Sequence, residues 1–269
     1  MAGESGPFIT LLTDFGTEDP WVGSLKSVIW QIQPAAKIID MTHAIPPCDV
    51  FAGAFALYRS YRDYPSWTIH VCVVDPGVGG LRRPILVVAD DRYFIGPDNG
   101  VFSFIYQFDV VHRVLHLTAD HYFRRPVSDT FHGRDIFAPV AAGLSKGVLA
   151  DRFGEEVQDY ARIPVPVDRI VGDTLAKGEI CVVDRFGNCI TNIRAATLEQ
   201  LGYKTGRQRF KVLVGGQEIP VVTGGYAQQA PLFALVGSSG LVEIAANARS
   251  AAQLLGVTGR GKEVGVMGA

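Results

Sequence analysis

Hydrophobic and polar positions in the first part of the chain alternate between two periods. Residues 8–14 form a short apolar run rich in β-branched side chains, which is typical of a buried strand. Asp19 can cap the free amides of a following helix, and Pro20 suits the first helical position. Across residues 22–32 the apolar positions then fall on one helical face, until Pro34 ends the run. The pattern therefore begins with a strand and continues with a helix.

The same alternation repeats further along the chain. It predicts strands at residues 37–41, 68–75 and 85–90, and helices at residues 49–61, 99–108 and 133–144, the first of these capped by Asp49. Strands that alternate with helices favour a mainly parallel sheet covered on both faces. The fold class predicted for residues 1–162 is therefore α/β.

The pattern of the sequence changes near Ile163, after which strands are more frequent than helices. Residues 163–176, which contain IPVPVDRIVGD, are predicted to form an extended linker, and residues 177–269 a smaller β domain. Strands are expected in this domain at residues 179–184, 209–214, 218–222, 232–236 and 241–245, with Gly-containing turns between them. These short strands favour an antiparallel β-barrel or sandwich. The Gly-rich tail from Gly256 is expected to be loose.

Composition and charge narrow the class of partner. The chain has 269 residues, of which 48% are hydrophobic and 19% charged, with a formal net charge of -2. This balance predicts neither a nucleic-acid-binding surface nor attraction to an anionic membrane. The start lacks the features of a signal peptide, and no apolar stretch approaches the ~20 residues of a membrane span. We therefore expect a cytoplasmic protein whose partner is a small molecule or another copy of the chain.

The cysteines do not form a metal-binding pattern. The four, Cys48, Cys72, Cys181 and Cys189, include no C-x-x-C pair, and two of them lie in apolar strand-like runs. Buried structural thiols are the favoured interpretation over metal ligands. No bound metal or cofactor is predicted.

Three acidic residues each follow an apolar run that is predicted to be a strand: Asp14, Asp75 and Asp90. Ligands of parallel sheets bind beyond the carboxyl ends of the strands, although each acid alone could equally cap or tie a loop. After Asp75 the sequence DPGVGGLRR can turn Arg82 back toward the carboxylate. A dinucleotide cofactor is disfavoured, because the glycine spacing is not G-x-G-x-x-G and a strand rather than a helix follows.

A second unusual segment is TFHGRDIFAP, residues 130–139. His132 precedes a predicted helix that Gly133 or Asp135 could help to initiate. A single histidine is more often structural than functional, so this segment alone assigns no chemistry.

Seven segments in order resemble one known family. They are TDFGTEDPWVG (13–23), DMTHAIPPCDV (40–50), VVDPGVGGLRRP (73–84), FIGPDNGVF (94–102), TFHGRDIFAP (130–139), VVDRFGNCITNI (182–193) and SSGLVEIAANA (238–248). Together they are similar to the S-adenosylmethionine (SAM) hydroxide adenosyltransferases, which are related to SAM-dependent fluorinases and chlorinases. The resemblance extends from about residue 8 to residue 256.

The resemblance implies a fold, an assembly and a reaction. It implies a Rossmann-like N-terminal domain, a smaller C-terminal β-barrel domain and a homotrimer, with SAM bound where one subunit's N-terminal domain meets a neighbour's C-terminal domain. The implied reaction uses water to cleave SAM into adenosine and methionine. In the family's water-activating set, the positions that match are Asp75, Arg82 and His132.

Further residues are assigned to substrate binding by the same resemblance. Asp14 is similar to the acid that accepts hydrogen bonds from both ribose hydroxyls. The residues that match the contacts to the methionine part and the adenine are Asp184, Asn188, Ser238, Ser239 and Ala248, and two aromatic side chains could stack on the base, Trp21 and Tyr226. As core or capping residues, the serines would need no ligand.

Two departures and two rival functions accompany the resemblance. Ser27 stands where the family usually has glycine, and Cys48 occupies a variable position. A SAM-dependent halogenase is disfavoured, because the halide-installing relatives have an uncharged tyrosine at the position of Asp75 and lack the equivalent of Arg82. The other rival is a non-catalytic module that binds SAM or adenosine without consuming it.

Overall fold

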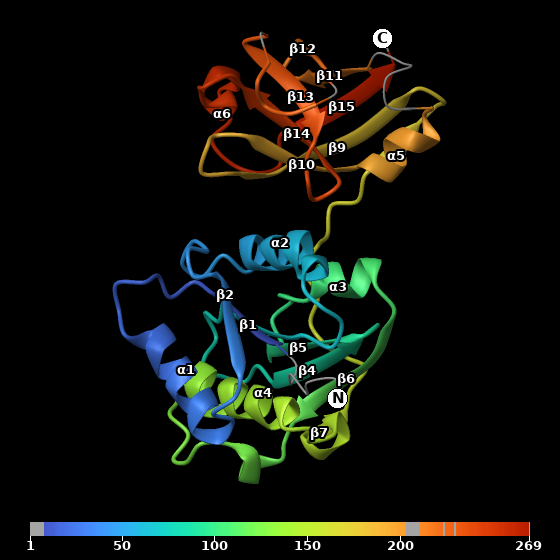
Figure 1. Ribbon diagram of the computed structural model, residues 1–269. Helices are drawn as coiled ribbons and strands as arrows, with labels where there is room; N and C mark the ends of the chain where they lie inside the picture. The colour runs from blue at the N-terminus through green and yellow to red at the C-terminus, as the bar shows by residue number, and fades with distance from the viewer. Residues whose placement is uncertain (1–7, 203–209, 223, 229, 269) are drawn as a thin grey trace, which may run out of the picture. The chain divides into compact units, whose positions relative to one another are not determined.

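The computed structural model describes residues 8–202, 210–222, 224–228 and 230–268, and its chain contacts divide it into two compact units (Figure 1). One unit ends at Val165 and the other begins at Pro166. The first is an α/β structure and the second an antiparallel β-barrel that is nearly closed, which confirms the predicted fold class.

The elements of the N-terminal unit follow the predicted alternation, with three additional strands in its second half. Its strands are β1 (Phe8–Thr13), β2 (Lys37–Thr42), β3 (Ile69–Val73), β4 (Pro84–Ala89), β5 (Arg92–Pro97), β6 (Val111–Leu117) and β7 (Gly154–Glu156). Its helices are α1 (Trp21–Ile32), α2 (Val50–Ser60), α3 (Ser103–Phe108), a π-helix (Gly133–Phe137), α4 (Ala138–Ser145) and three short 3₁₀ turns (Tyr61–Asp63, Asp120–Tyr122 and Ala150–Arg152). Strands β5, β6 and β7 were absent from the sequence prediction.

The sheet of this unit is mixed around a parallel core. Its strand order is β2-β1-β3-β5-β4-β6-β7, and the pairs β2/β1, β1/β3 and β3/β5 are parallel. The other neighbours are antiparallel, because a tight turn at Asp90 and Asp91 joins β4 to β5 as a hairpin. Asp90 supports this turn with a left-handed φ of 48°, which aspartate tolerates better than most residues.

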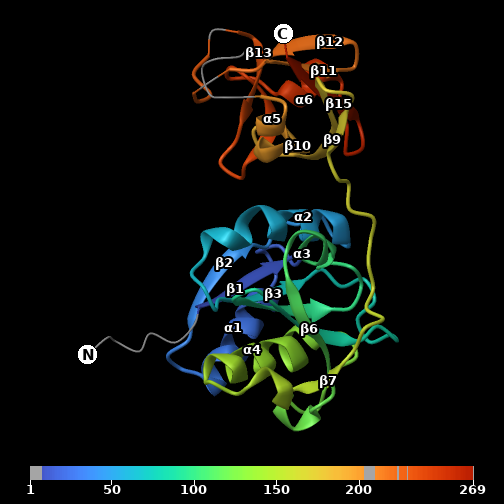
Figure 2. The same cartoon turned by 90° about the vertical axis from the view of Figure 1, so that its right-hand side faces the viewer.

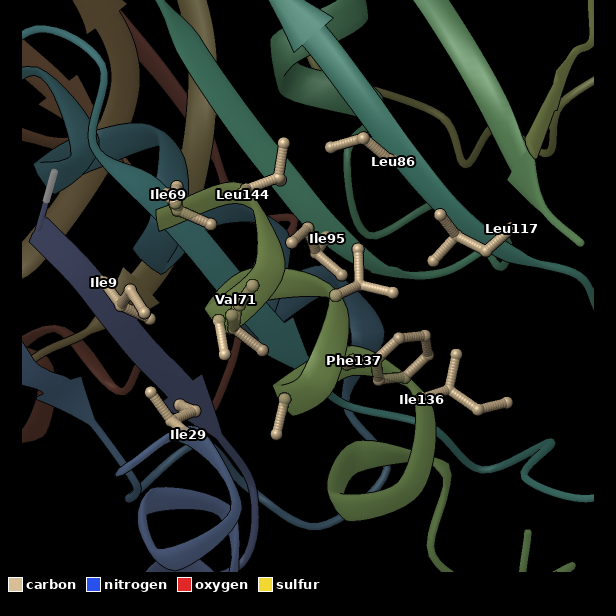
Figure 3. Close-up of a cluster of buried hydrophobic side chains, with 14 of the residues drawn as sticks. Ile9, Ile29, Ile69, Val71, Leu86, Ile95, Leu117, Ile136, Phe137 and Leu144 are labelled. Atoms are coloured by element: carbon tan, nitrogen blue, oxygen red, sulfur yellow. The ribbon is translucent and has the colours of Figure 1, made fainter. Parts of the chain in front are cut away.

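Helices cover both faces of the sheet. Helices α1 and α4 lie on one face and α2 and α3 on the other, as the two views in Figures 1 and 2 show. Between the sheet and the α1/α4 layer lies an apolar core that includes Ile9, Ile29, Val71 and Phe137 (Figure 3). Burial of such side chains is the main stabilising contribution, at roughly 1.5–3 kcal/mol for each large residue.

The first residues of the helices show which of the predicted caps are formed. Asp49 accepts a hydrogen bond from the Ala52 amide at 3.0 Å, which confirms it as the cap of α2. The predicted cap at Asp19 is wrong: Pro20 occupies the cap position of α1, one residue later, without a side-chain cap among the described residues. Asp135 is also wrong as a helix initiator, because its buried carboxylate accepts hydrogen bonds from Ser128 and from arginines instead.

The C-terminal unit contains β8 (Arg169–Val171), β9 (Leu175–Val183), β10 (Cys189–Arg194), α5 (Ala195–Gln200), β11 (Phe210–Val214), β12 (Gln217–Pro220), β13 (Leu232–Val236), β14 (Leu241–Ala246), α6 (Ala251–Leu255) and β15 (Glu263–Gly268). Its strand order is β12-β11-β15-β9-β10-β14-β13, with β8 paired to β9. The amide of Val222 donates to the carbonyl of Ala234 at 2.8 Å, which links the two ends of the sheet into a nearly closed barrel. Arg209, the first residue of one predicted strand, lies outside the described residues.

The tail prediction is wrong. Residues 263–268 form β15, which lies between β9 and β11 and pairs with both. Val264 and Val266 alternate with Gly265 and Met267 and lie in the barrel core, fully buried. The two-residue period of these valines outweighs the glycine content, because a strand flanked on both sides is held by two ladders of hydrogen bonds.

Three cysteines, Cys72, Cys181 and Cys189, are buried, whereas Cys48 is exposed. Within the described ranges, no helix has the length and apolar character needed to cross a membrane.

Val266→Ala tests the structural role of β15. Because the side chain is fully buried, the variant should lower the free energy of unfolding by about 1.5–3 kcal/mol. Glu263→Ala in the same strand is the control, since its pair with Lys177 is exposed and should leave the melting temperature nearly unchanged. Denaturant unfolding followed by circular dichroism measures both. An unaltered Val266→Ala protein would contradict the placement of this strand in the core.

Candidate active site

The four parallel strands end at one edge of the sheet, and each is followed there by polar residues. In sheet order, His43 follows β2, Asp14 follows β1, Asp75 lies two residues beyond β3, and Asn99 lies two residues beyond β5. This is the edge at which ligands of α/β proteins bind. Asp90 is not among them: β4 runs antiparallel to β5, so Asp90 lies at the opposite edge and forms a hairpin turn.

Asp75, Arg82 and His132 meet at this edge. Arg82 donates from Nε to Asp75 Oδ1 at 3.0 Å and from Nη2 to Asp75 Oδ2. The same Nη2 lies 2.8 Å from His132 Nδ1. The side chains of Asp75 and Arg82 are only 5% and 9% exposed, so the carboxylate and guanidinium are removed from water as a bidentate pair. One cation therefore bridges a carboxylate and an imidazole.

The glycine loop between Asp75 and Arg82 is shaped by a close approach. Gly79 has a φ of 76°, and a Cβ at this position would lie 2.1 Å from the carbonyl oxygen of Asp129. Only glycine fits there, because both the left-handed backbone and the nearby main chain exclude a side chain. The loop thus packs against the segment that carries His132. The close approach that the glycines permit is to the protein's own main chain.

The contact with Arg82 fixes the state of His132. A guanidinium has no acceptor, so Nδ1 must be unprotonated and the neutral ring carries its hydrogen on Nε2. Burial lowers the pKa of His132, and the charge of Arg82 lowers it further, while Asp75 and Asp129 act in the opposite direction. The ring is therefore neutral at pH 7, and its Nε2–H is a hydrogen-bond donor.

Asp14 lies beside this cluster, in a cavity of about 420 Å³. Its Oδ2 accepts a hydrogen bond from the Cys48 amide at 2.8 Å. Trp21, the first residue of α1, stands at the same cavity with its ring edge-on to Phe131 at 5.4 Å. The cavity is lined by Asp14, Phe15, Trp21, Val73, Asp75, Val78, Ser128, Thr130, Phe131, His132, Gly133 and Arg134.

The C-terminal unit has a second cavity, of about 650 Å³. Asp184 accepts hydrogen bonds from the amides of Phe186 and Asn188 and from the Asn188 side chain, all at 2.8–2.9 Å. Tyr226 donates its hydroxyl to Glu243 at 2.7 Å. The lining residues are Asp184, Phe186, Asn188, Tyr226, Ala246, Ala248, Arg249 and Ser250. This cavity brings together four of the residues predicted to bind substrate.

Ser238 and Ser239 lie apart from that set, in the turn between β13 and β14. Ser238 is exposed. The Oγ of Ser239 is buried and has no hydrogen-bond partner among the residues that the structure describes. A buried hydroxyl without a partner is costly unless a ligand or water completes it.

Several residues support the site without having been predicted. The Asn99 side chain donates to the Val74 carbonyl at 2.8 Å, and so fixes the main chain next to Asp75. Arg83 pairs with the buried Asp98 at 2.7 Å, which anchors the strand after the glycine loop. The segment FIGPDNGVF was a signal for both, but only as part of the family resemblance. No group of three or more His, Cys, Asp or Glu residues suited to a metal occurs in the described part of the chain.

These features define a class of protein: a two-unit protein with an α/β unit, a β-barrel unit and cavities suited to a small molecule. The family follows from sequence. Residues 9–154 match the SAM hydroxide adenosyltransferase N-terminal domain, and residues 178–264 match the corresponding C-terminal domain. The chain belongs to the SAM hydroxide adenosyltransferase family.

Its relatives include named enzymes and solved structures. The (R)-S-adenosyl-L-methionine hydrolase of Thermus thermophilus is 35% identical, over 93% of this chain and 95% of that protein, and the one of Salinispora tropica is 37% identical, over 94% and 95%. A fluorinase of an Actinoplanes species is 25% identical. The crystal structure of an uncharacterized conserved protein from Thermotoga maritima has a TM-score of 0.88 at 35% identity and covers 97% of this chain and 100% of that one.

The geometry around His132 predicts the direction of two pKa changes. In long-range ¹H–¹⁵N NMR spectra, His132 should titrate below pH 6.5 and carry its hydrogen on Nε2 when neutral. Arg82→Met removes a repelling cation and should raise the midpoint, whereas Asp75→Asn removes an attracting carboxylate and should lower it. A midpoint that falls in Arg82→Met would contradict the cluster.

Proposed function

We propose that this chain hydrolyses SAM, with a water molecule attacking the ribose C5′ to give adenosine and L-methionine. The carrying observation is the Asp75–Arg82–His132 cluster, which lies beside Asp14 at the carboxyl edge of the parallel strands. Four relatives spanning nearly the whole chain are named (R)-S-adenosyl-L-methionine hydrolases. We therefore also propose the (R) sulfonium epimer as the substrate.

The reaction needs a positioned nucleophile more than it needs an acid. The bond between the water oxygen and C5′ forms as the C5′–S bond breaks, and the electron pair of that bond passes to sulfur. The positive sulfonium becomes the neutral thioether of methionine, so the leaving group requires no protonation. One proton is released from the attacking water. Holding this water in line, at about 3–3.5 Å from the carbon, supplies much of the acceleration.

Asp75 is the better candidate to take that proton. The unprotonated nitrogen of His132 is occupied by Arg82, and its other nitrogen already carries hydrogen. Each oxygen of Asp75 accepts one hydrogen bond from Arg82 and retains a lone pair for water. In this assignment Arg82 orients Asp75 and balances its charge, and the Nε2–H of His132 helps to orient the water or the ribose.

The binding assignments divide between the units. In the first unit, one oxygen of Asp14 accepts from Cys48, which leaves the other to accept from the ribose hydroxyls, and Trp21 offers an exposed ring to the adenine. In the second unit, the methionine part and the adenine are assigned to the residues carried over by resemblance, Asp184, Asn188, Ser238, Ser239, Ala248 and Tyr226. The Oγ of Ser239 is buried and has no hydrogen-bond partner among the described residues, which supports a contact with a polar ligand group at that turn.

Hydrolysis of SAM in oxygen-18 water tests the reaction. Chromatography with mass detection should show adenosine labelled in its 5′-hydroxyl, together with unlabelled methionine. Asp75→Asn should reduce turnover by about 10²–10⁴-fold because the general base is lost, while SAM affinity changes little. Epimerically enriched SAM in the same assay tests the (R) preference.

Two other outcomes of that assay would overturn the proposal. SAM recovered intact after prolonged incubation would make the protein a SAM-binding module. A 5′-halogenated nucleoside formed in chloride or fluoride would make it a halogenase. The negative Asp75 disfavours the second outcome, because a carboxylate at the nucleophile's position repels an entering halide.

A homotrimer with active sites shared between subunits remains a prediction from the family resemblance, as do a cytoplasmic location and independence from metals and cofactors. Mixing two inactive variants tests the shared site. Asp75→Asn and Asp184→Ala chains, co-expressed in equal amounts, should regain about a quarter of wild-type activity if each site combines the N-terminal unit of one copy with the C-terminal unit of another in a closed ring. Sites built from one chain would give no recovery.

A further inference from the structure

The segment DMTH (40–43) forms part of the family resemblance but has no role in the reaction as assigned above. It lies where β2 ends, next to the end of β1 in the sheet. We propose that His43 and Thr13 are positioning residues for Asp14, which they hold in place for the ribose hydroxyls. This inference rests on the proposed function, since it presumes that Asp14 binds the ribose.

His43 fastens the chain on both sides of Asp14. Before it, the Thr13 hydroxyl lies 2.8 Å from His43 Nδ1. After it, the Gly16 amide donates to the main-chain oxygen of His43 at 2.8 Å. Thr13 is 0% exposed and His43 6% exposed, so water does not compete for these contacts. The four-residue segment 13–16 is therefore tied at both ends to a single residue of the neighbouring strand.

The polar contacts around His43 favour one tautomer, although its buried Nε2 lies close to Asp40 without the geometry of a hydrogen bond. His43 Nε2 lies 3.1 Å from Asp40 Oδ1, and Asp40 Oδ2 accepts from Lys26 at 2.7 Å. An ionised carboxylate only accepts, so the Nε2 of the histidine carries its hydrogen and Nδ1 accepts from the Thr13 hydroxyl. The Thr13 oxygen is then free to accept the Phe15 amide, which lies 3.2 Å away.

Lys26 and Asp40 complete this arrangement by holding His43 in one tautomer. Burial alone would raise the pKa of Asp40, but the contacts with Lys26 and His43 outweigh it and lower the pKa, so this carboxyl stays ionised at pH 7. The result is a chain of contacts that fixes the backbone at residues 13, 15 and 16. The Cys48 amide fixes Oδ2 of Asp14, so the direction of its other oxygen is set.

The test compares adenosine with 2′,3′-dideoxyadenosine, which lacks the hydroxyls that Asp14 is proposed to bind. In calorimetry on the full chain, Thr13→Val should weaken adenosine binding by about 5- to 30-fold, because the acceptor is no longer held in place. Binding of the dideoxy analogue should change by less than about twofold. Thr13→Ser keeps the hydroxyl and should restore adenosine binding.

Two histidine variants separate the contacts of the ring. His43→Asn places an amide oxygen near Nδ1 and can still accept from Thr13, whereas His43→Gln places its amide near Nε2 and leaves Thr13 without an acceptor. We expect a larger loss of adenosine binding in His43→Gln. If Thr13→Val does not fold, the comparison of these two histidine variants tests the proposal instead.

Strand β1 also provides a matched control. Thr10, likewise buried, makes a contact of the same kind, 2.8 Å to His70 Nδ1, three residues before Thr13. Thr10→Val removes a comparable threonine–histidine contact from the same strand without touching the segment that carries Asp14. It should lower the melting temperature as Thr13→Val does, but leave the preference for adenosine over the dideoxy analogue unchanged.

Asp14→Ala distinguishes failure of this inference from failure of the proposed function. If Asp14→Ala retains the preference for adenosine, the ribose assignment itself is wrong. If Asp14→Ala loses the preference while Thr13→Val and His43→Gln keep it, the positioning role is wrong. An equal loss of binding for both nucleosides would mean that Thr13 and His43 contribute only to the stability of the fold. Support requires that Thr13→Val adds no further loss in the Asp14→Ala background.

Discussion

The bidentate contact between Arg82 and Asp75 is the interaction on which the site depends. A carboxylate that is 5% exposed is too costly to keep ionised alone, and a guanidinium only 9% exposed is no less so. Paired, both oxygens of the carboxylate accept from Nε and Nη2 of the guanidinium, whereas its buried Nη1 has no hydrogen-bond partner among the described residues. Because the same Nη2 also faces His132, the pair sets the tautomer of the imidazole as well. One cation thus binds both oxygens of the acid, sets the direction of the histidine and links the loops that carry them.

The parallel core of the sheet explains why these groups meet. Strands that run the same way deliver their following residues to one edge, and neighbouring strands place those residues side by side. His43, Asp14, Asp75 and Asn99 occupy that edge in the order of their strands. The antiparallel half of the sheet also contributes to it, because Arg82 precedes β4, which begins at this edge, and β6 ends at the same edge before the segment that carries His132. The residues that hold the site in place therefore come from neighbouring strands along this edge.

Much of this could be predicted from the sequence where a local signal was strong. The apolar run before Asp14, the Asp49 cap and the apolar run of residues 232–236 correspond to observed elements. Other features depended on tertiary context. The direction of β4, and with it the location of Asp90, follows from its hairpin with β5, a strand that was absent from the sequence prediction. Strand β15 was not predicted, because the glycines around it favoured a loose tail. The ties made by Asn99 and His43 depend on which strands are neighbours, and a single sequence does not state that order.

The charge of the cluster also bears on the choice of nucleophile. A halide must shed its hydration and then lie beside a carboxylate, and at about 4 Å that repulsion is on the order of 4 kcal/mol for an effective dielectric constant near 20. Arg82 offsets part of this, but both oxygens of Asp75 are engaged by the guanidinium, so the positive charge lies close against the carboxylate and already has its partner. Water enters without charge, and under the proposed function Asp75 accepts the proton that it must lose. On that proposal, the pair that makes anion entry costly is also the one that activates water.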